Sequence, residues 1–90
     1  MNKTIITVVG KDAVGIIAKV CTYLAENNAN ILDISQTIVQ EYFNMMMIVD
    51  LAHVEKTFEV IAEELSAVGM ALGVQVKCQR QETFDKMHRI

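Results

Sequence analysis

The chain lacks proline and tryptophan altogether, and only two of its 90 residues are cysteines. Because no proline, Ser/Gly-rich linker or low-complexity stretch interrupts the sequence, we expect a single domain. Cys21 and Cys78 lie far apart in the sequence, in no spacing typical of metal ligands, and each falls on an apolar phase of its segment. We therefore expect two buried, reduced thiols, and we predict neither a metal site nor a cofactor.

Positive charge is also scarce, since 8 lysines and arginines stand against 11 aspartates and glutamates and the net charge is -3. A protein that binds nucleic acid through electrostatics needs a basic face, so nucleic acid is not an expected partner. The longest strongly apolar run, residues 45–49, is far too short to cross a bilayer. No signal peptide is visible, because the N-terminus enters a strand almost at once. The sequence thus predicts a cytoplasmic protein with no membrane partner.

Apolar residues, by contrast, are abundant, at 52% of the composition. A chain of this length buries only about two-thirds of the surface that its unfolded form exposes. The apolar excess therefore predicts a second buried surface, most simply a subunit interface.

Hydrophobic periodicity divides the sequence into six main elements and a tail. The predicted first helix, for example, carries the apolar stripe Ile17, Val20, Cys21 and Leu24. The order strand–helix–strand–strand–helix–strand is the ferredoxin-like βαββαβ plan, an α+β fold with a four-stranded antiparallel sheet and both helices on one face. The predicted strands span 3–9, 31–40, 43–51 and 74–79, the helices span 14–27 and 54–72, and the domain spans 1–82, followed by a tail, 83–90, that can form a short helix capped by Thr83.

The strand over 43–51 is apolar on both faces, with Phe43, Met45, Met47 and Val49 on one and Met46 and Ile48 on the other. An antiparallel strand with one face in water should alternate between apolar and polar residues, so we expect both faces to be covered. In the preceding strand, strict alternation places Leu32, Ile34, Gln36 and Ile38 on one face and Ile31, Asp33, Ser35, Thr37 and Val39 on the other. The face of the sheet away from the helices then needs a partner, a ligand or the tail as cover, and we expect a homodimer.

The stretch Gly10-Lys11-Asp12-Ala13-Val14-Gly15-Ile16 joins the first strand to the first helix. A helix start offers free backbone N–H groups and the positive end of the helix dipole, which favour an anion such as a carboxylate. Asp12 can accept from a ligand ammonium or cap the helix, and Gly15 permits close approach of a ligand or of the sheet. A ligand site and a purely structural turn both remain open for this loop.

This loop, followed by Ala29-Asn30-Ile31 at the start of the next strand, is similar to that of the ACT domain. The similarity extends to Asp33-Ile34-Ser35-Gln36, to Phe43-x-Met45 and to the final Met87-His88-Arg89-Ile90, and it covers essentially the whole chain. The sequence resembles small stand-alone ACT proteins, related to the regulatory modules of the glycine cleavage repressor and formyltetrahydrofolate deformylase. It departs from the family at Val14, where proline is common and would fix the backbone more rigidly.

The resemblance implies a non-catalytic regulatory domain that forms a homodimer and binds a small ligand, often an amino acid, between subunits. In such domains the ligand contacts the first loop of one subunit and the start of the second strand of its neighbour. The implied ligand-binding positions are Asp12, Ala13, Val14 and Gly15 in the loop and Asn30 and Ile31 on the strand. A regulated enzyme or transcription unit is a further implied partner. The alternative is a dimeric protein-interaction module without a ligand.

The sequence lacks the residues on which other protein classes with this topology depend. A nucleoside-triphosphatase loop needs Lys and Ser/Thr where Ile16 and Ile17 stand. Acylphosphatase needs an arginine in its loop, whereas the arginines are Arg80 and Arg89. Copper chaperones need paired cysteines in the loop, and an RNA-recognition motif needs exposed aromatic residues and a basic surface. We therefore predict no enzymatic activity.

Overall fold

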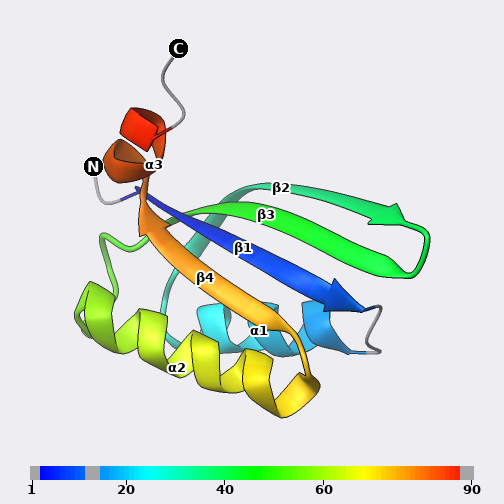
Figure 1. Cartoon of the computed structure of the whole chain (residues 1–90). Helices are drawn as coiled ribbons and strands as arrows, with labels where there is room; N and C mark the ends of the chain where they lie inside the picture. Colours follow the sequence, from blue (N-terminus) through cyan, green and yellow to red (C-terminus); the bar gives the residue numbers. More distant parts are fainter. Residues whose placement is uncertain (1–2, 12–14, 88–90) are drawn as a thin grey trace.

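A computed structural model describes residues 3–11 and 15–87 (Figure 1). The strands are β1 (Lys3–Lys11), β2 (Asn30–Val39), β3 (Tyr42–Asp50) and β4 (Gln75–Arg80), and the helices are α1 (Ile16–Glu26), α2 (Phe58–Leu72) and α3 (Gln81–Met87). The first six elements follow the predicted βαββαβ order. None of the helices in the described ranges is long and apolar enough to cross a membrane.

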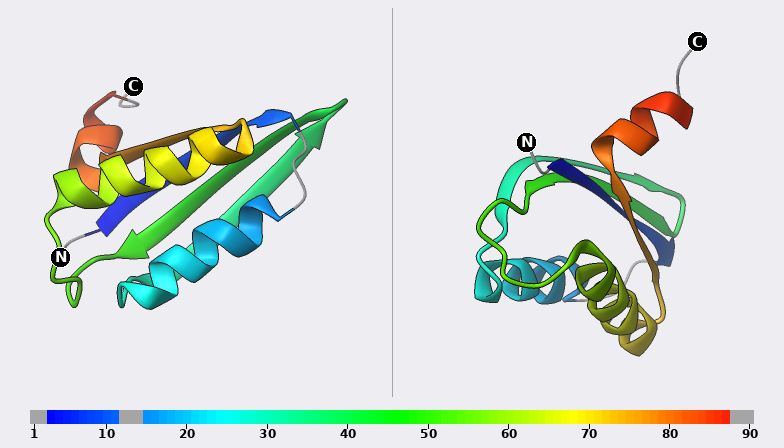
Figure 2. Two further views of the ribbon diagram at one scale, coloured as in Figure 1. Left: turned by 90° about the horizontal axis from the view of Figure 1, so that it is seen from below. Right: turned by 90° about the vertical axis from the view of Figure 1, so that its left-hand side faces the viewer.

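The four strands form one antiparallel sheet in the order β2-β3-β1-β4. Helices α1 and α2 lie side by side on one face of this sheet, whereas α3 lies on the opposite side at one end (Figures 1 and 2). Of the two, α1 lies toward β2 and α2 packs on β4. The ferredoxin-like α+β fold predicted from the sequence is therefore confirmed.

The core lies between the sheet and the helix pair. On this face Ile6 stands opposite Met47 and Val8 opposite Met45, and all four side chains are fully buried. The helices contribute the fully buried side chains Val20, Leu24, Ile61 and Leu65. Met46 points to the other face and is 38% exposed. The predicted division of β3 into two faces is therefore correct.

Helix α1 begins two residues later than predicted, and its buried stripe differs. Gly15 adopts a left-handed backbone conformation with φ of 85°, so the helix begins at Ile16. The buried side chains of α1 are then Ile16, Val20 and Leu24, one every four residues. Ile17, which was predicted to face the core, is 38% exposed. The predicted stripe is therefore correct at Val20 and Leu24, with Cys21 half-buried against the core, and Ile16 takes the place expected for Ile17.

Helix α2 begins at Phe58, not at residue 54, because its cap lies at Thr57. The Thr57 hydroxyl accepts a hydrogen bond from the backbone N–H of Val60 at 3.3 Å, which satisfies a donor that a helix start leaves free. At the other end Gly73 has a φ of 73° and closes the helix in the left-handed conformation.

The predicted alternation of β2 is wrong at its beginning. The pairing register with β3 shifts between Ile31 and Asp33, which is a β-bulge. Ile31 stands opposite Val49 and Ile34 stands opposite Met47, so both isoleucines lie on the helix-facing side of the sheet. A bulge inserts one extra residue into a strand, and strict alternation fails across it.

The tail helix α3 begins at Gln81, directly after β4, and not near Thr83 as predicted. It contacts β1 and β4 from the side away from α1 and α2 (Figure 2). At that end of the open sheet face Ile5 is only 3% exposed, whereas Val9 and Met46 farther along are 43% and 38% exposed. Helix α3 therefore covers one end of this face, and no other described residue covers the rest.

Candidate functional site

The loop between β1 and α1 contains most of the ligand-binding positions predicted from the sequence. Asp12, Ala13 and Val14 lie outside the described residues. Gly15 is exposed, and a Cβ atom built on it would meet no described atom within 4 Å. Glycine is therefore favoured here by its left-handed φ and not by a close contact. Its carbonyl accepts from the N–H of Lys19 at 2.9 Å, which fixes the first turn of α1.

The remaining predicted positions, Asn30 and Ile31, open strand β2. Asn30 is exposed and pairs with Asp50, and Ile31 is half-buried against the core. Asp50 pairs in turn with Lys3, the first residue of β1. The start of β2 therefore lies at the end of the sheet where β1 begins.

The end of β1, which leads to Gly15, and the start of β2 lie at opposite ends of the sheet (Figure 1). Gly15 follows the end of β1, whereas Asn30 lies beside its start. Helix α1, 11 residues long, runs between them. At a rise of 1.5 Å per residue this helix separates the two groups by about 16 Å. Among the described residues, one chain therefore does not bring Gly15 and the start of β2 together.

Strand β2 is an edge strand with its outer side unpaired among the described residues. Every residue from 32 to 40 is exposed, and Ile34 and Ile38 are 43% and 58% exposed although they lie on the helix-facing side. Natural edge strands usually carry lysine or proline, which discourage pairing with another chain. β2 has neither, and its one charged residue is Asp33. This edge is suited to pairing with another strand.

A partly exposed polar cluster joins α1 and α2 on the side of the sheet that these helices cover. The Tyr23 hydroxyl donates to Glu64 Oε1 at 2.5 Å, and Lys56 Nζ donates to the same oxygen at 2.8 Å. The bonds from Lys56 and then from Tyr23 hold the pKa of Glu64 below its usual value. Burial and the bond to Glu64 raise the pKa of Tyr23. The cluster fixes α1, α2 and the segment before α2 relative to one another.

The two cysteines are half-buried against the core and not fully buried as predicted. Burial raises the pKa of the Cys78 thiol to about 11, so at neutral pH it is protonated and a poor nucleophile. Among the residues that the structure describes, no group of three or more His, Cys, Asp or Glu side chains is placed to hold a metal ion.

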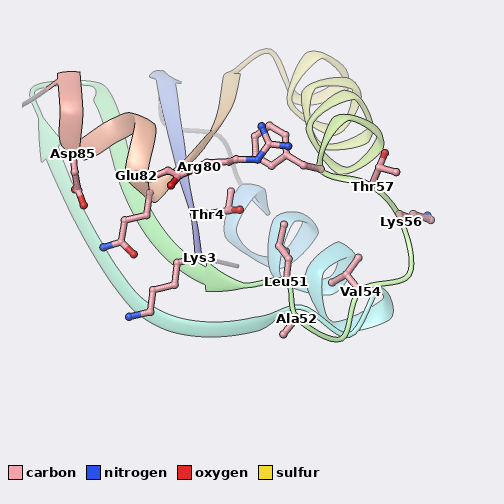
Figure 3. Close-up of a pocket in the computed structure, with 12 residues that line it drawn as sticks. Lys3, Thr4, Leu51, Ala52, Val54, Lys56, Thr57, Arg80, Glu82 and Asp85 are labelled. Carbon is pink, nitrogen blue, oxygen red and sulfur yellow. The ribbon is translucent and has the colours of Figure 1, made fainter. Parts of the chain in front are cut away.

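A cleft of about 720 Å³ opens at the end of the sheet where β1 begins (Figure 3). We call it the end cleft; it is formed by the start of β1, residues 51–58 and the junction of β4 with α3. Arg80 lines it, with the guanidinium 4.3 Å from the ring centroid of Phe58 and Nη2 donating to Glu59 Oε2 at 3.3 Å. No motif in the sequence marks this cleft, because its lining comes together only through the pairing of Thr4 with Arg80.

Comparison with known proteins gives a family for this arrangement. The profile of the ACT domain matches residues 2–79, which is most of the chain. The chain belongs to the ACT-domain family. The match runs from β1 into β4 and stops before α3, so the α3 wall of the end cleft lies outside it. ACT domains are small-molecule regulatory modules and are usually non-catalytic.

Two of the chain's relatives are similar to it along nearly their whole length. It is 61% identical over 90 residues to a UPF0237 protein of Bifidobacterium longum, with 100% of both chains covered. An ACT domain protein from Streptococcus pneumoniae, whose structure is solved, is 43% identical with a TM-score of 0.81 over 93% of this chain and 94% of that one. A formyltetrahydrofolate deformylase from Pseudomonas syringae has a TM-score of 0.80 at 20% identity, over 88% of this chain and 27% of the deformylase, a likeness of fold alone. The resemblance seen in the sequence is confirmed.

Proposed function

We propose that this ACT domain binds an amino acid between two copies of the chain and acts as a non-catalytic regulatory sensor. One observation carries the proposal. The two halves of the predicted site lie at opposite ends of α1, while β2 presents an apolar edge without a described partner. A second copy completes the site only if it brings its own Asn30 to the Gly15 end.

Antiparallel pairing of β2 with β2 of a second copy meets this condition. Identical strands related by a two-fold axis run in opposite directions, so Asn30 of the second copy lies near Val39 of the first. Val39 pairs with Tyr42, and Tyr42 pairs with Lys11 at the end of β1. That end leads directly into the loop before α1. Each dimer would therefore carry two equivalent sites.

The side chains of β2 favour one register for this pairing. With Gln36 on the two-fold axis, Ile34 lies opposite Ile38 of the second copy, and Ser35 lies opposite Thr37. The two exposed isoleucines then cover each other on the helix-facing side. Such cross-strand pairs contribute roughly 0.2–1 kcal/mol each, beyond the backbone hydrogen bonds that the free edges gain.

The proposed site has the chemistry that an amino-acid zwitterion needs. The carboxylate requires donors, which the free N–H groups at the start of α1 supply. The ammonium requires acceptors, for which we propose the Asp12 carboxylate and the side-chain carbonyl of Asn30 from the second copy. Ala13, Val14 and Gly15 would contribute backbone and Ile31 would contribute apolar contact.

Isothermal calorimetry and thermal unfolding against each common amino acid test this proposal. At a ligand concentration about tenfold above Kd, binding should stabilise the folded protein by about 1.4 kcal/mol. Asn30→Ala and Asp12→Ala should abolish the shift without changing the stability of the free protein by more than about 0.5 kcal/mol. Asn44→Ala, an exposed asparagine on β3, is the matched control and should leave the shift intact.

Light scattering measures the oligomeric state of the protein. At micromolar protein concentration it should report a dimer. A monomer would remove the second half of the site and with it the proposal. A dimer that no amino acid stabilises at millimolar concentration would refute the sensor and leave the second candidate function.

That second candidate is a dimeric interaction module without a ligand. It is favoured by the open sheet face, where Val9, Val39, Tyr42 and Met46 are all at least 38% exposed in a single chain. Exposed apolar patches of this kind commonly mark protein interfaces. The amino-acid titration separates the two functions, because only the sensor predicts a ligand-induced shift.

A further inference from the structure

Strand β4 forms the edge of the sheet opposite to β2, and its outer side is unpaired among the described residues. It pairs with β1 on its inner side. A strand at an edge presents a row of free backbone N–H and C=O groups, which are a template for another strand. If two copies pair through β2, as proposed above, the joined sheet ends in β4 on both sides. The properties of β4 therefore decide whether assembly stops at two copies.

The surroundings of the β4 edge favour contact with another chain. A cavity of about 490 Å³ lies between α2 and the start of β4, and its lining includes Ser66, Met70 and Val76. Met70 is 78% exposed, and methionine adapts well to different contact surfaces because its side chain is flexible and apolar. Both the free backbone and this apolar lining would stabilise a strand added at the edge.

Lys77 opposes such an addition from the middle of β4. It stands opposite Thr7 of β1 and is exposed on the outer face of the sheet, whereas its neighbour Val76 is buried on the helix-facing side. Within the described part of the chain, Lys77 takes part in no ion pair. A lysine on an edge strand discourages pairing, because another chain would have to accommodate its charge.

The charge of Lys77 acts most strongly against a second copy of the same strand. Two-fold axes at Lys77 and at Cys78 give the longest antiparallel pairings of β4 with itself, over 75–79 and 76–80 respectively. With the axis at Lys77 the two lysines lie directly opposite each other, and like charges in this position destabilise a strand pair. With the axis at Cys78 they are diagonal neighbours roughly 7–8 Å apart, still within reach of long side chains.

We propose that Lys77 makes β4 a selective edge, closed to β4 of a second copy and open to an extended segment that carries a carboxylate opposite Lys77. A carboxylate at that position replaces the repulsion between two lysines with an opposite-charge pair across the strands, which stabilises a sheet. If β2 pairs as proposed, Lys77 also ends the joined sheet at two copies, and this consequence alone rests on the proposed function.

Neutralisation of Lys77 tests the closed state of the edge. Lys77→Gln and Lys19→Gln each remove one exposed lysine and change the net charge equally, so Lys19→Gln is the matched control. Light scattering from about 1 μM to 1 mM protein, a range that covers weak association, should show Lys77→Gln assembling beyond the wild-type mass. Lys19→Gln should keep the wild-type mass throughout. An identical mass for both variants at every concentration would overturn the closure by Lys77.

A charge swap tests the open state. Lys77→Glu alone again places like charges on the axis, whereas an equimolar mixture of the wild type and Lys77→Glu pairs a lysine with a carboxylate. The mixture should therefore associate roughly tenfold more tightly than either protein alone. Because the pair is exposed, about 0.5 M NaCl should reduce this gain. A mixture that associates no better than its components would overturn the selectivity.

A disulfide locates the contact in that mixture. With the axis at Lys77, residue 75 of one chain lies opposite residue 79 of the other. Gln75→Cys should therefore crosslink under mild oxidation to the double variant Lys77→Glu, Gln79→Cys. In the control mixture both proteins carry Gln75→Cys, and these cysteines lie about 14 Å apart, so they should not crosslink. Association without the first crosslink would place the contact elsewhere and overturn the proposal.

The mass of the mixture separates this proposal from the pairing through β2. If the wild type is a dimer, both edges are used and the mixture should grow beyond four copies. If the wild type is a monomer, the β2 pairing fails, and the mixture should stop at pairs of one wild-type chain and one Lys77→Glu chain. Either growth pattern, with the first crosslink present, supports the selectivity of β4.

Discussion

At the scale of single residues, Gly69 shows how tightly α2 packs on the sheet. It lies inside the helix, where glycine costs about 1 kcal/mol relative to alanine. A Cβ atom at this position would lie 2.6 Å from Val76 Cγ2 and 2.9 Å from the backbone oxygen of Val74. The backbone oxygen belongs to the chain entering β4 and is not free to move aside. The absent side chain is therefore what allows α2 to approach β4 so closely.

Gly69→Ala should destabilise the protein by about 1–3 kcal/mol, because overpacking outweighs the better helix propensity of alanine. Urea unfolding of the variant and the wild type measures the difference. Ala67→Ser, at an exposed position of the same helix, is the control and should change stability by less than about 0.5 kcal/mol. An unchanged or raised midpoint for Gly69→Ala would mean that α2 moves away from β4 at little cost.

Glu64 gives the fold a pH dependence on the acid side. Its pKa lies below the ordinary value of 4.5, chiefly through Lys56 and then Tyr23. A carboxyl whose pKa is lower in the folded state stabilises the protein fully above the unfolded-state pKa, and this contribution is lost as the pH falls through the folded-state value. The difference in unfolding free energy between the wild type and Glu64→Gln should therefore shrink as the pH is lowered below 4.5.

Denaturant unfolding at a series of pH values measures this difference. Glu63→Gln, an exposed neighbour on the same helix, is the control and should follow the wild type throughout. If the difference in unfolding free energy between the wild type and Glu64→Gln grew as the pH was lowered, the lowered pKa assigned to Glu64 would be wrong.

At the scale of elements, strand β2 sets the geometry of any second copy. If two copies pair through β2 with Gln36 on the axis, the Cα atoms of the two Gln36 residues lie about 4.5–5.5 Å apart, within the range that a disulfide spans. Gln36→Cys should therefore form a covalent dimer under mild oxidation, visible by non-reducing electrophoresis.

Asp33→Cys is the control for this crosslink. In the same register each residue 33 lies opposite residue 39, six positions from its own counterpart, so the two cysteines are about 20 Å apart. Asp33→Cys and the wild type, with its half-buried Cys21 and Cys78, should remain uncrosslinked. Efficient crosslinking through Asp33→Cys, with none through Gln36→Cys, would rule out this register.

The ends of the elements show where sequence patterns stop being informative. Periodicity located every strand and both core helices, because burial of one face requires it whatever the detailed packing. It placed the start of α1 two residues too early and Ile17 in the core, since Gly15 takes a left-handed φ that spacing alone does not reveal. It also missed the bulge after Ile31, because a bulge exists only relative to the partner strand.

At the scale of the whole molecule, the chain is flat, with principal extents of 36, 35 and 19 Å. The thin dimension holds one sheet and one layer of helices, so among the described residues only α3 covers part of the outer face of the sheet (Figure 2). This explains the apolar excess in the composition: side chains such as Val39 and Tyr42, 62% and 54% exposed, belong to a face that one chain does not cover. A second copy is the simplest cover.

The flat shape also separates the candidate sites. The loop before α1 and the start of β2 lie at opposite ends, and the end cleft shares the end of Asn30 and Lys3. Ligand binding at the loop, as proposed above, would therefore depend on assembly.

The sequence by itself determined the βαββαβ order and the two faces of β3, because both follow from local periodicity, and its motifs carried the resemblance to the ACT family. It also pointed to Gly15 and Asn30 as candidate site residues. Only the tertiary structure decided that these two residues do not meet within one chain, because α1 lies between them. The end cleft likewise became visible only in three dimensions, since the pairing of Thr4 with Arg80 joins segments that are 76 positions apart (80 minus 4). Long-range register is a property of the whole sheet, and no local pattern encodes it.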